Sequence, residues 1–538
     1  MQVIRGKYYF GLSANNRIRV IPLEGWRGRI FDRNGVVLAD SRLSYDVMVV
    51  PQDIKGVQEL FGFLSRVLET SKDSLIQKYQ QKKYALFAPV VVAEDIPRAK
   101  AIILEENKFL FPNLIVQESF KRFYPLKENS AHILGYVGKI NRMRIEQLKE
   151  YGYSPQSLVG YTGIEEYYDA NLRGEEGGLQ IEVDNKGQQV RLLSLKEPSR
   201  GQDIVITVDS SLQQYASELL QDNPGVISIM DIHSGEMLAL VSSPGFDPNF
   251  PSQISGKKAA FLNRSIQGLY PPGSVFKVIM ALSGLVNQKI SENTTFNCGG
   301  FLELGGARFG CTLRHGEQNL IEALAHSCNV YFYNVGRILG EEKISRFAQL
   351  FGLGVLTRVD LPHEEEGYIP SLRKRMLLNK GRWYGGDTLN MSIGQGDVLV
   401  TPIQLTRMMA TVAREGVEVQ PHFIKAIGGV PENKYAFERS IRADKNYFKI
   451  VQRGLRAAVT DYSGTAHGID INGLYVAGKT GTAQSSGSQN AHAWFVGFTK
   501  DTKQEIAFCV FLEHGGSSHG AVLLAQQLLL RLQQEKIL

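Results

Sequence analysis

The 538-residue sequence has no run of about 18 or more apolar residues, so it predicts no segment that spans a membrane. Its first six residues, Met-Gln-Val-Ile-Arg-Gly, lack the apolar region of a secretory signal peptide. Blocks of basic residues interleaved with aromatic ones are also missing, which argues against nucleic acid as a partner. The motifs of the chain therefore have to carry the functional argument.

Length and composition indicate several folded domains. A chain of 538 residues exceeds what one hydrophobic core supports, so two or three domains are expected. The apolar share of 43% and the charged share of 21% are ordinary for globular proteins, and the net charge of +6 is modest. Aromatic residues at positions 8–10 precede a polar segment at 15–19, and we expect this to be the outer end of a segment anchored upstream.

Residues 1–200 are predicted to form an elongated N-terminal pedestal. Asn34-Gly35 between two apolar runs indicates a β-hairpin. Residues 46–125 alternate helical patterns with valine-rich runs, which predicts a small α+β head subdomain. Residues 126–200 are rich in Gly and Tyr, so this stretch is expected to wrap or link other elements.

The pattern changes at Asp203, and residues 201–538 are predicted to form a second domain. Asp209 is expected to cap a helix over 211–220. Strands are expected at 204–208, 226–230, 237–241, 474–477, 493–498 and 505–513, and helices around 274–287, 319–340, 402–414 and 521–534. Together these patterns predict an α+β multidomain fold.

Three short strings occur in order in this second domain: Ser274-Val-Phe-Lys277, Ser327-Cys328-Asn329 and Lys479-Thr480-Gly481-Thr482. Each string alone is weak evidence for a catalytic site, and the first by itself is better explained as a chance match on an ordinary helix. Together they supply a nucleophile, a proton shuttle and a clamp for an oxyanion and a carboxylate. Such a set is typical of penicillin-binding proteins and class A β-lactamases.

Ser274 follows Pro and Gly and should lie in the first turn of a helix, where free backbone N–H groups favour a developing oxyanion. Lys277 lies on the same helix face, so its amine can reach the Ser274 hydroxyl. The amine serves as a base near neutral pH only if burial or a neighbouring cation lowers its pKa, and Lys479 would be such a cation.

Ser327 and Asn329 are spaced to point into one cleft. Ser327 would relay a proton to the leaving amine, and Asn329 would hold the substrate backbone or Lys277. Helix capping is the alternative role for both residues.

The third string follows an expected strand. Gly481 predicts the close approach of another backbone, which we expect to be the acyl donor lying along the strand edge. Lys479 and the hydroxyls of Thr480 and Thr482 suit a carboxylate. The N–H of Thr482 would complete an oxyanion hole with that of Ser274.

At these residues the chain resembles a class B penicillin-binding protein, and within that class the penicillin-binding protein 2 type of the elongation machinery. Nearly the whole chain takes part in the resemblance, and further matching segments are Arg27–Gly35, Gly163–Glu165, Leu262–Arg264, Gly394–Gly396 and Thr401-Pro402. The resemblance implies a β-lactamase-like penicillin-binding transpeptidase domain, an antiparallel sheet flanked by helices, on a membrane-proximal pedestal of the dimerisation type.

The resemblance also implies a two-step D,D-transpeptidase reaction during cell-wall elongation. Ser274 attacks the penultimate D-Ala carbonyl of a peptidoglycan stem peptide, and an amine of a neighbouring strand then attacks the acyl-enzyme. β-Lactams imitate the donor and leave Ser274 acylated. Implied partners are a RodA-type SEDS glycan polymerase and an elongation scaffold protein. The implied location is the periplasmic side of the inner membrane, with a single N-terminal anchor that this sequence lacks.

Other functions stay open from the residues alone. A division-type class B transpeptidase shares the strings, and so does a serine D,D-carboxypeptidase or β-lactamase, which hydrolyses the acyl-enzyme without needing a long N-terminal part. A β-lactam sensor or assembly scaffold would be non-enzymatic, and intact Ser274, Lys277 and Lys479 argue against it. Steady turnover of penicillin would select the hydrolase, and absence of covalent labelling would select the scaffold.

Three of the four cysteines are close in sequence. Cys298, Cys311, His315 and Cys328 form a permitted structural zinc set, whereas no cofactor is expected for catalysis. Zinc would pin the loop that carries the second string. A Cys298–Cys311 disulfide and plain buried thiols are the alternatives. Cys509, in an apolar strand, is expected in the core.

Overall fold

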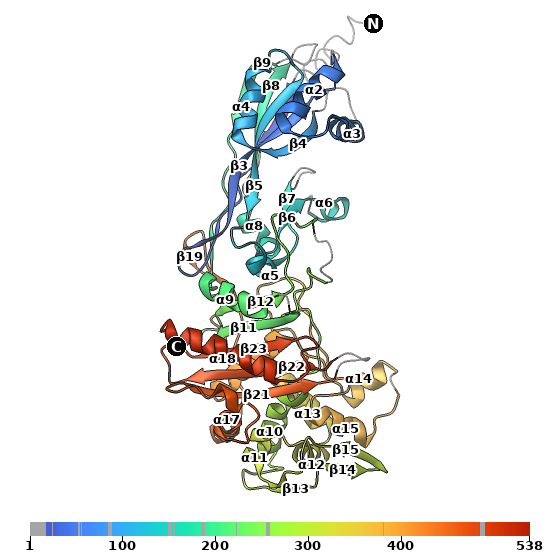
Figure 1. The fold of residues 1–538 in the computed structure, drawn as a ribbon, viewed down its shortest axis with the longest axis vertical. Helices are drawn as coiled ribbons and strands as arrows, with labels where there is room; N and C mark the ends of the chain where they lie inside the picture. Colours follow the sequence, from blue (N-terminus) through green and yellow to red (C-terminus); the bar gives the residue numbers. More distant parts are fainter. Residues whose placement is uncertain are drawn as a thin grey trace, which may run out of the picture.

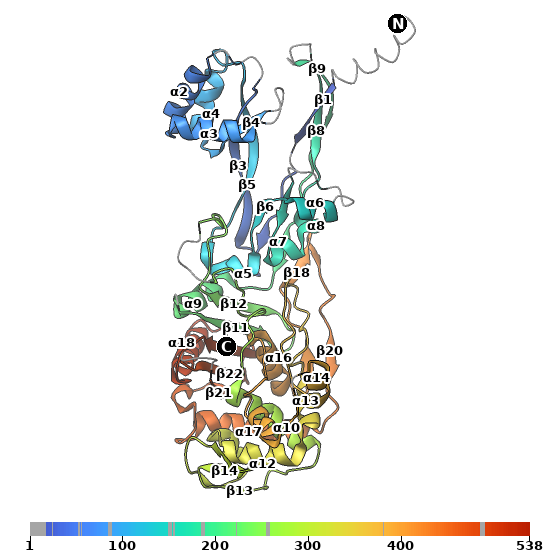
Figure 2. The ribbon, with the colours of Figure 1, turned by 90° about the vertical axis from the view of Figure 1, so that its right-hand side faces the viewer.

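The computed structural model describes residues 18–538 except for 24, 52–53, 55, 84–88, 149–152, 154–156, 184–188, 222, 254–258, 380 and 485–489. The aromatic residues at 8–10 lie outside the described residues. The molecule is elongated, with the described N-terminal elements at one end and the C-terminus within a sheet domain toward the other (Figures 1 and 2). Among the described residues, no helix combines the length and apolar character needed to cross a membrane.

One long strand organises the pedestal. β3 (Val37–Val49) pairs along most of its length with β5 (Leu114–Phe123) and over its second half with β4 (Val90–Ile96). The helices α2 (Val57–Leu68), α3 (Lys72–Lys82) and α4 (Arg98–Glu106) pack on this end of the sheet and share its core. β2 (Ile30–Phe31) joins β3 antiparallel through the Asn34-Gly35 turn, where Gly35 has φ +86°, so the predicted hairpin is confirmed.

Shorter elements complete the pedestal. β1 (Ile18–Leu23), β8 (Gly177–Val183) and β9 (Gln189–Lys196) form a separate three-stranded sheet, and β6 (Val137–Lys139) pairs with β7 (Leu158–Gly160). The short helices are η1 (Lys127–Ser130), α5 (Ala131–Leu134), α6 (Arg142–Leu148), α7 (Gly163–Tyr167) and α8 (Asp169–Leu172).

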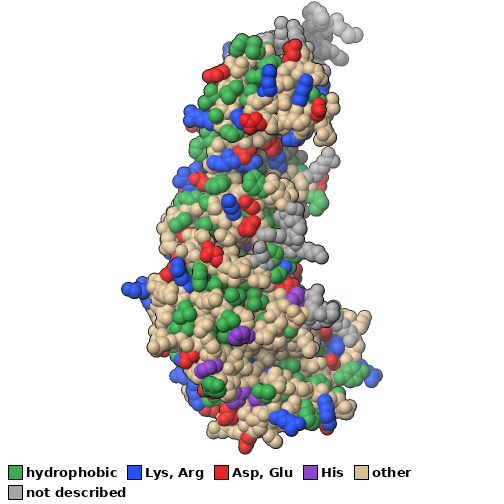
Figure 3. All heavy atoms as spheres, in the orientation of Figure 1, with side chains coloured by type: hydrophobic (Ala, Val, Ile, Leu, Met, Phe, Trp, Pro, Cys, Tyr) green, Lys and Arg blue, Asp and Glu red, His purple; other side chains and the backbone are tan. Residues whose placement is uncertain are grey.

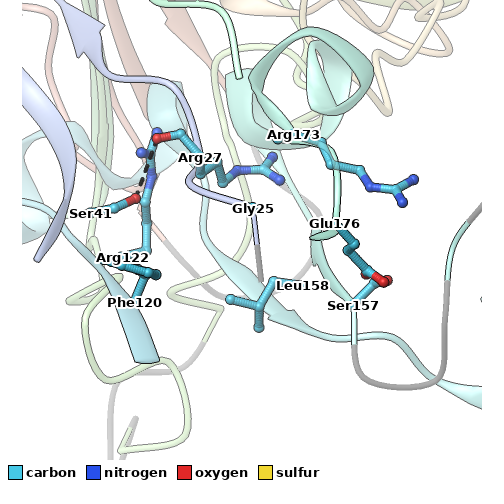
Figure 4. Close-up of a pocket in the computed structure, with 10 residues that line it drawn as sticks. Gly25, Arg27, Ser41, Phe120, Arg122, Ser157, Leu158, Arg173 and Glu176 are labelled. Carbon is cyan, nitrogen blue, oxygen red and sulfur yellow. Dashed lines mark hydrogen bonds between the residues drawn. The ribbon is translucent and has the colours of Figure 1, made fainter. Parts of the chain in front are cut away.

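A buried ion network fixes the middle of the pedestal. The Glu165 carboxylate is fully buried and accepts hydrogen bonds from Arg27 Nε and Arg122 Nε, each at 2.6 Å. Burial opposes the charge of Glu165, but the two guanidinium groups lower the pKa of its carboxyl below the usual value. Figure 4 shows Arg27 and Arg122 beside a cavity of about 50 Å³, which is too small for a peptide substrate.

The second domain is built on a five-stranded antiparallel sheet in the order β12-β11-β23-β22-β21. Its strands are β11 (Gly225–Asp231), β12 (Met237–Ser243), β21 (Tyr475–Ala483), β22 (His492–Lys500) and β23 (Ile506–Leu512). Alternate residues of β11 enter different cores: Val226 and Met230 join one, and Ile227 and Ile229 the other. Helices therefore cover both faces, and most strand residues are buried rather than alternately buried and exposed.

Helices α9 (Ser210–Leu220) and α18 (His519–Gln534) cover one face of this sheet, and α16 (Pro402–Ala413) covers the other. The expected N-cap is confirmed, because Asp209 accepts from the backbone N–H groups of Ser211 and Leu212. The remaining helices are η3 (Gly273–Phe276), α10 (Lys277–Val286), α11 (Leu320–Ala325), α12 (Asn329–Leu339), α13 (Glu341–Leu350), α14 (Leu372–Leu377), α15 (Gly385–Ser392), α17 (Lys445–Thr460) and η4 (His467–Ile469).

The domain also contains several two-stranded sheets, and one larger sheet includes strands of both the domain and the pedestal. β10 (Ile204–Ile206) pairs with β2 of the pedestal and with β18 (Ile424–Ile427), so the two parts share backbone hydrogen bonds. The other small strands are β13 (Phe296–Cys298), β14 (Phe301–Leu304), β15 (Ala307–Gly310), β16 (Gly316–Gln318), β17 (Val417–Val419), β19 (Val430–Pro431) and β20 (Glu438–Ser440).

Candidate active site

The turn that carries Ser274 is locked by a glycine contact. Gly273 has φ +55° and donates its N–H to the carbonyl of Gly394 at 3.0 Å. A Cβ at Gly394, where φ is +68°, would stand 2.3 Å from the Gly273 carbonyl oxygen, so this position requires glycine. Ser274 is half-buried and opens onto a cavity of about 540 Å³.

Lys277 connects the first string to the second. Its side chain is fully buried, and Nζ donates to Asn329 Oδ1 at 2.6 Å, to the Ser327 carbonyl at 2.7 Å and to Ser327 Oγ at 3.2 Å. Burial lowers the pKa of the Lys277 amine to about 8, while Cys311 and Cys328 oppose this shift. Of the two causes considered from the sequence, burial or a neighbouring cation, burial is the one that lowers this pKa.

The second string lies in a break between two helices. The expected helical region 319–340 is divided into α11 and α12, because Ser327 adopts a left-handed conformation with φ +56°. Such a conformation is unfavourable for a serine and persists where its surroundings hold it, here through the bond from Lys277 to the Ser327 carbonyl. Asn329 is the first residue of α12 and holds Lys277, one of its two predicted roles.

The third string lies on the edge strand β21, which is longer than the predicted 474–477. Lys479 is fully buried, and burial together with the charge of Lys277 lowers its pKa well below the ordinary value. Thr480 donates through Oγ1 to Thr465 Oγ1 at 2.8 Å, whereas Thr482 is exposed. Thr480 and Thr482 both line the cavity onto which Ser274 opens.

Gly481 marks a close approach within the protein itself, to the turn that carries Ser274. A Cβ at Gly481 would lie 2.9 Å from the carbonyl oxygen of Pro272 and 3.0 Å from Val275 Cγ2. Glycine at this position therefore lets the Ser274 turn pack directly against β21. The acyl donor lying along the edge of β21 stays a prediction.

Several cavity residues carried no recognisable signal in the sequence. His326 lines the cavity, and its Nε2 lies 3.0 Å from Ser463 Oγ while Nδ1 lies 2.7 Å from Gln318 Oε1. Thr465 donates its backbone N–H to the Ala325 carbonyl at 3.2 Å. These contacts connect α11 to the loop before β21. No spacing rule links residues so far apart in the chain, so only the fold reveals them.

The cysteine cluster includes Cys328, the middle residue of the second string. The ligand atoms of Cys298, Cys311, His315 and Cys328 all lie within 4.8 Å of one another, and Cys311 Sγ is 3.5 Å from His315 Nδ1. All four cysteines of the chain are free thiols, so the alternative disulfide is not formed, and Cys509 is in the core as expected. A hydrogen bond from Cys328 holds the pKa of the Cys311 thiol below its ordinary value.

Comparison with known proteins follows the same division of the chain. Residues 22–206 match the penicillin-binding protein dimerisation domain, and residues 225–530 match the penicillin-binding protein transpeptidase domain. The peptidoglycan D,D-transpeptidase MrdA of Acinetobacter baumannii is 33% identical, with 98% of this chain and 83% of the relative covered. MrdA of Escherichia coli K12 is 30% identical, over 98% of this chain and 90% of the relative.

The chain belongs to the penicillin-binding protein 2 family of peptidoglycan D,D-transpeptidases. A solved complex of penicillin-binding protein 2 with MreC from Helicobacter pylori has a TM-score of 0.86 and 30% identity, covering 97% of this chain and all of that one. A chain of a peptidoglycan synthase complex that coordinates polymerization and crosslinking has a TM-score of 0.75 and 30% identity, with 98% and 92% covered. The predicted α+β fold and transpeptidase class are confirmed.

Proposed function

We propose that Ser274 is the nucleophile of peptidoglycan cross-linking and that Lys277 is its base. The observation that carries this proposal is the buried Lys277 amine, which contacts Ser327 and Asn329 at 2.6–3.2 Å beneath the cavity onto which Ser274 opens. Burial favours the neutral amine, which accepts a proton, over the ammonium ion, which cannot. The three strings thus converge as one acyl-transfer site.

In the first step, Ser274 Oγ bonds to the penultimate D-Ala carbonyl carbon while its proton passes to Lys277. The developing oxyanion is stabilised by the N–H groups of Ser274 and Thr482, and Lys479 with the threonines receives the terminal carboxylate. Ser327 relays the proton to the leaving nitrogen, and D-Ala departs as the C–N bond breaks. The peptide bond energy is retained in the ester.

In the second step, an amine of a neighbouring stem peptide attacks the ester carbonyl. The new C–N bond forms, the ester C–O bond breaks, and the amine proton returns to Ser274 Oγ through the same relay. β-Lactams acylate Ser274 by the same first step, but the second step fails because no leaving group departs from the site.

The test is labelling of the full chain with a fluorescent penicillin, wild type against Ser274→Ala. Wild type should be labelled stably and the variant should not be labelled. Label retained by Ser274→Ala would refute the nucleophile assignment, and rapid loss of label from wild type would favour a hydrolase over a transferase.

The role in elongation and the partners are proposed from the relatives. The Helicobacter pylori protein is solved with MreC, and another similar chain belongs to a complex that coordinates polymerization and crosslinking. A scaffold of the MreC kind and a RodA-type polymerase are therefore the proposed partners, at the periplasmic face of the inner membrane. Co-purification of both with the full-length protein is expected, whereas exclusive recovery of division proteins would overturn the elongation role.

A structural zinc ion is proposed for the cysteine cluster. Three thiols and one imidazole Nδ1 within 4.8 Å suit tetrahedral zinc, which prefers this donor set. Cys328 adjoins both Ser327 and Asn329, so an ion held there would stiffen the loop that positions Lys277. Metal analysis of purified protein should give about one equivalent of zinc, and less than a tenth of an equivalent with unreacted thiols would end this proposal.

A further inference from the structure

The segment between Tyr368 and α15 is connected at both ends to elements that lead to the cavity. This segment, residues 371–379 and 381–384, is called the basic arm; it contains α14. Before it, Tyr368 exchanges backbone hydrogen bonds with Leu399. The residue after Leu399, Val400, does so with Tyr270, four residues before Ser274. After it, α15 ends at residues that line the cavity. Figures 1 and 2 both place α14 at the level of β21.

The basic arm exposes large apolar side chains. Met376 is 62% exposed, Leu377 75%, Leu378 55% and Tyr384 67%. Figure 3 shows hydrophobic and basic side chains together at this edge of the molecule. Four such residues within nine positions are more than scattered surface hydrophobics, and a cluster of this kind indicates a binding surface.

The charge of the basic arm is of one sign. No acidic residue occurs between 371 and 384. Arg373 and Arg382 are exposed, and neither makes a hydrogen bond or ion pair with another residue that the structure describes. Arg375 is different, since it pairs with Asp387 at 2.6 Å and stacks on Trp383, and these contacts hold the arm in shape. Two arginines are thus free to meet an anionic partner.

We propose that the basic arm binds the acceptor peptidoglycan strand. This inference rests on the proposed function, in which the donor peptide fills the cleft and a second polymer has to be held beside it. An acceptor strand carries free carboxylates on its stem peptides and apolar faces on its sugar rings, which complement free arginines next to exposed apolar side chains. Binding there would raise the local concentration of the acceptor amine near the acyl-enzyme, which favours transfer over hydrolysis.

Two other occupants fit less well. A lipid surface is disfavoured because the arm lies on the catalytic domain, at the opposite end of the molecule from the head (Figure 1). A second copy of the chain is disfavoured because two arms would bring four unpaired arginines together, and like charges repel.

The experiment measures strand binding after the donor cleft has been blocked. Full-length protein is acylated with penicillin, and its affinity for soluble, uncross-linked glycan strands with pentapeptide stems is measured by sedimentation. Arg373→Glu/Arg382→Glu should weaken binding about ten-fold and leave the rate of penicillin acylation unchanged. Met376→Ser/Leu377→Ser should weaken binding without changing the charge. The control Arg66→Glu/Lys78→Glu makes the same charge change on exposed residues of the head and should have no effect.

Each other result overturns the inference. Equal binding by wild type and both arm variants would show that the acceptor binds elsewhere. If the arm variants lose binding to anionic phospholipid vesicles while their strand binding stays intact, the arm is a membrane contact. A difference in molecular mass in solution between wild type and the arm variants would make the arm a contact between copies of the chain. Failure of wild type to acylate would instead refute the proposed function, so the two failures are distinguishable.

Discussion

Acylation of Ser274 should follow the protonation state of Lys277. Burial lowers the pKa of Lys277 to about 8, and only the neutral amine can take the serine proton. The neutral fraction is then about 1% at pH 6, about 10% at pH 7 and about half at pH 8. The acylation rate should therefore fall about ten-fold for each pH unit below about 7 and level off above about 9.

The assay is the second-order rate constant for acylation by a fluorescent penicillin, measured between pH 6 and 9.5. Lys277→Met should lower the constant by at least about a hundred-fold at pH 8, which is the usual contribution of a positioned base. Lys289→Met is the matched control, because Lys289 is exposed just beyond α10 and should leave the profile unchanged.

Two results would refute this reasoning. A rate that stays constant across the range would mean that Lys277 does not titrate as the base. A rate that still rises with unit slope at pH 9.5 would mean that burial does not lower the pKa from its ordinary value of 10.5. Unfolding has to be followed at each pH, so that loss of structure is not counted as loss of reactivity.

Three further predictions concern stability and the cleft. Burial lowers the pKa of His132 to about 4, so the unfolded state binds more protons than the folded state between pH 6.5 and 4. The free energy of unfolding, measured by urea titration, should therefore fall by about 3 kcal/mol on acidification from above pH 6.5. The fall should be smaller in His132→Phe. Glu165→Gln leaves two buried guanidinium groups poorly compensated and should cost about 3–5 kcal/mol of unfolding free energy, whereas an unchanged urea midpoint would contradict the network. Gly394→Ala should slow penicillin acylation about ten-fold or more while circular dichroism is unchanged, since its Cβ would displace the Ser274 turn; an unaltered rate would show that the turn relaxes freely.

Much of the fold could be predicted from the sequence because the features that specify it are local. The Asn34-Gly35 hairpin, the Asp209 cap and the strands β11, β12, β22 and β23 lie at or near their predicted positions. These features depend on turn sterics, capping bonds and the burial of short apolar runs, which neighbouring residues fix among themselves. The bond from Lys277 that holds the left-handed backbone of Ser327 could not be predicted, because it joins residues that are far apart in the chain.

What the sequence determined by itself was the set of reactive groups and their order: a serine with a lysine one turn later, a second serine with an amide, and a cationic strand. Only the tertiary structure decided what these groups touch. It packed Gly481 against the Pro272 carbonyl, made burial the main cause of the lowered Lys277 pKa, and joined His326 to Ser463. The physical reason is that side-chain type is a property of each residue, whereas contact and burial arise from the packing of elements that are remote in the chain.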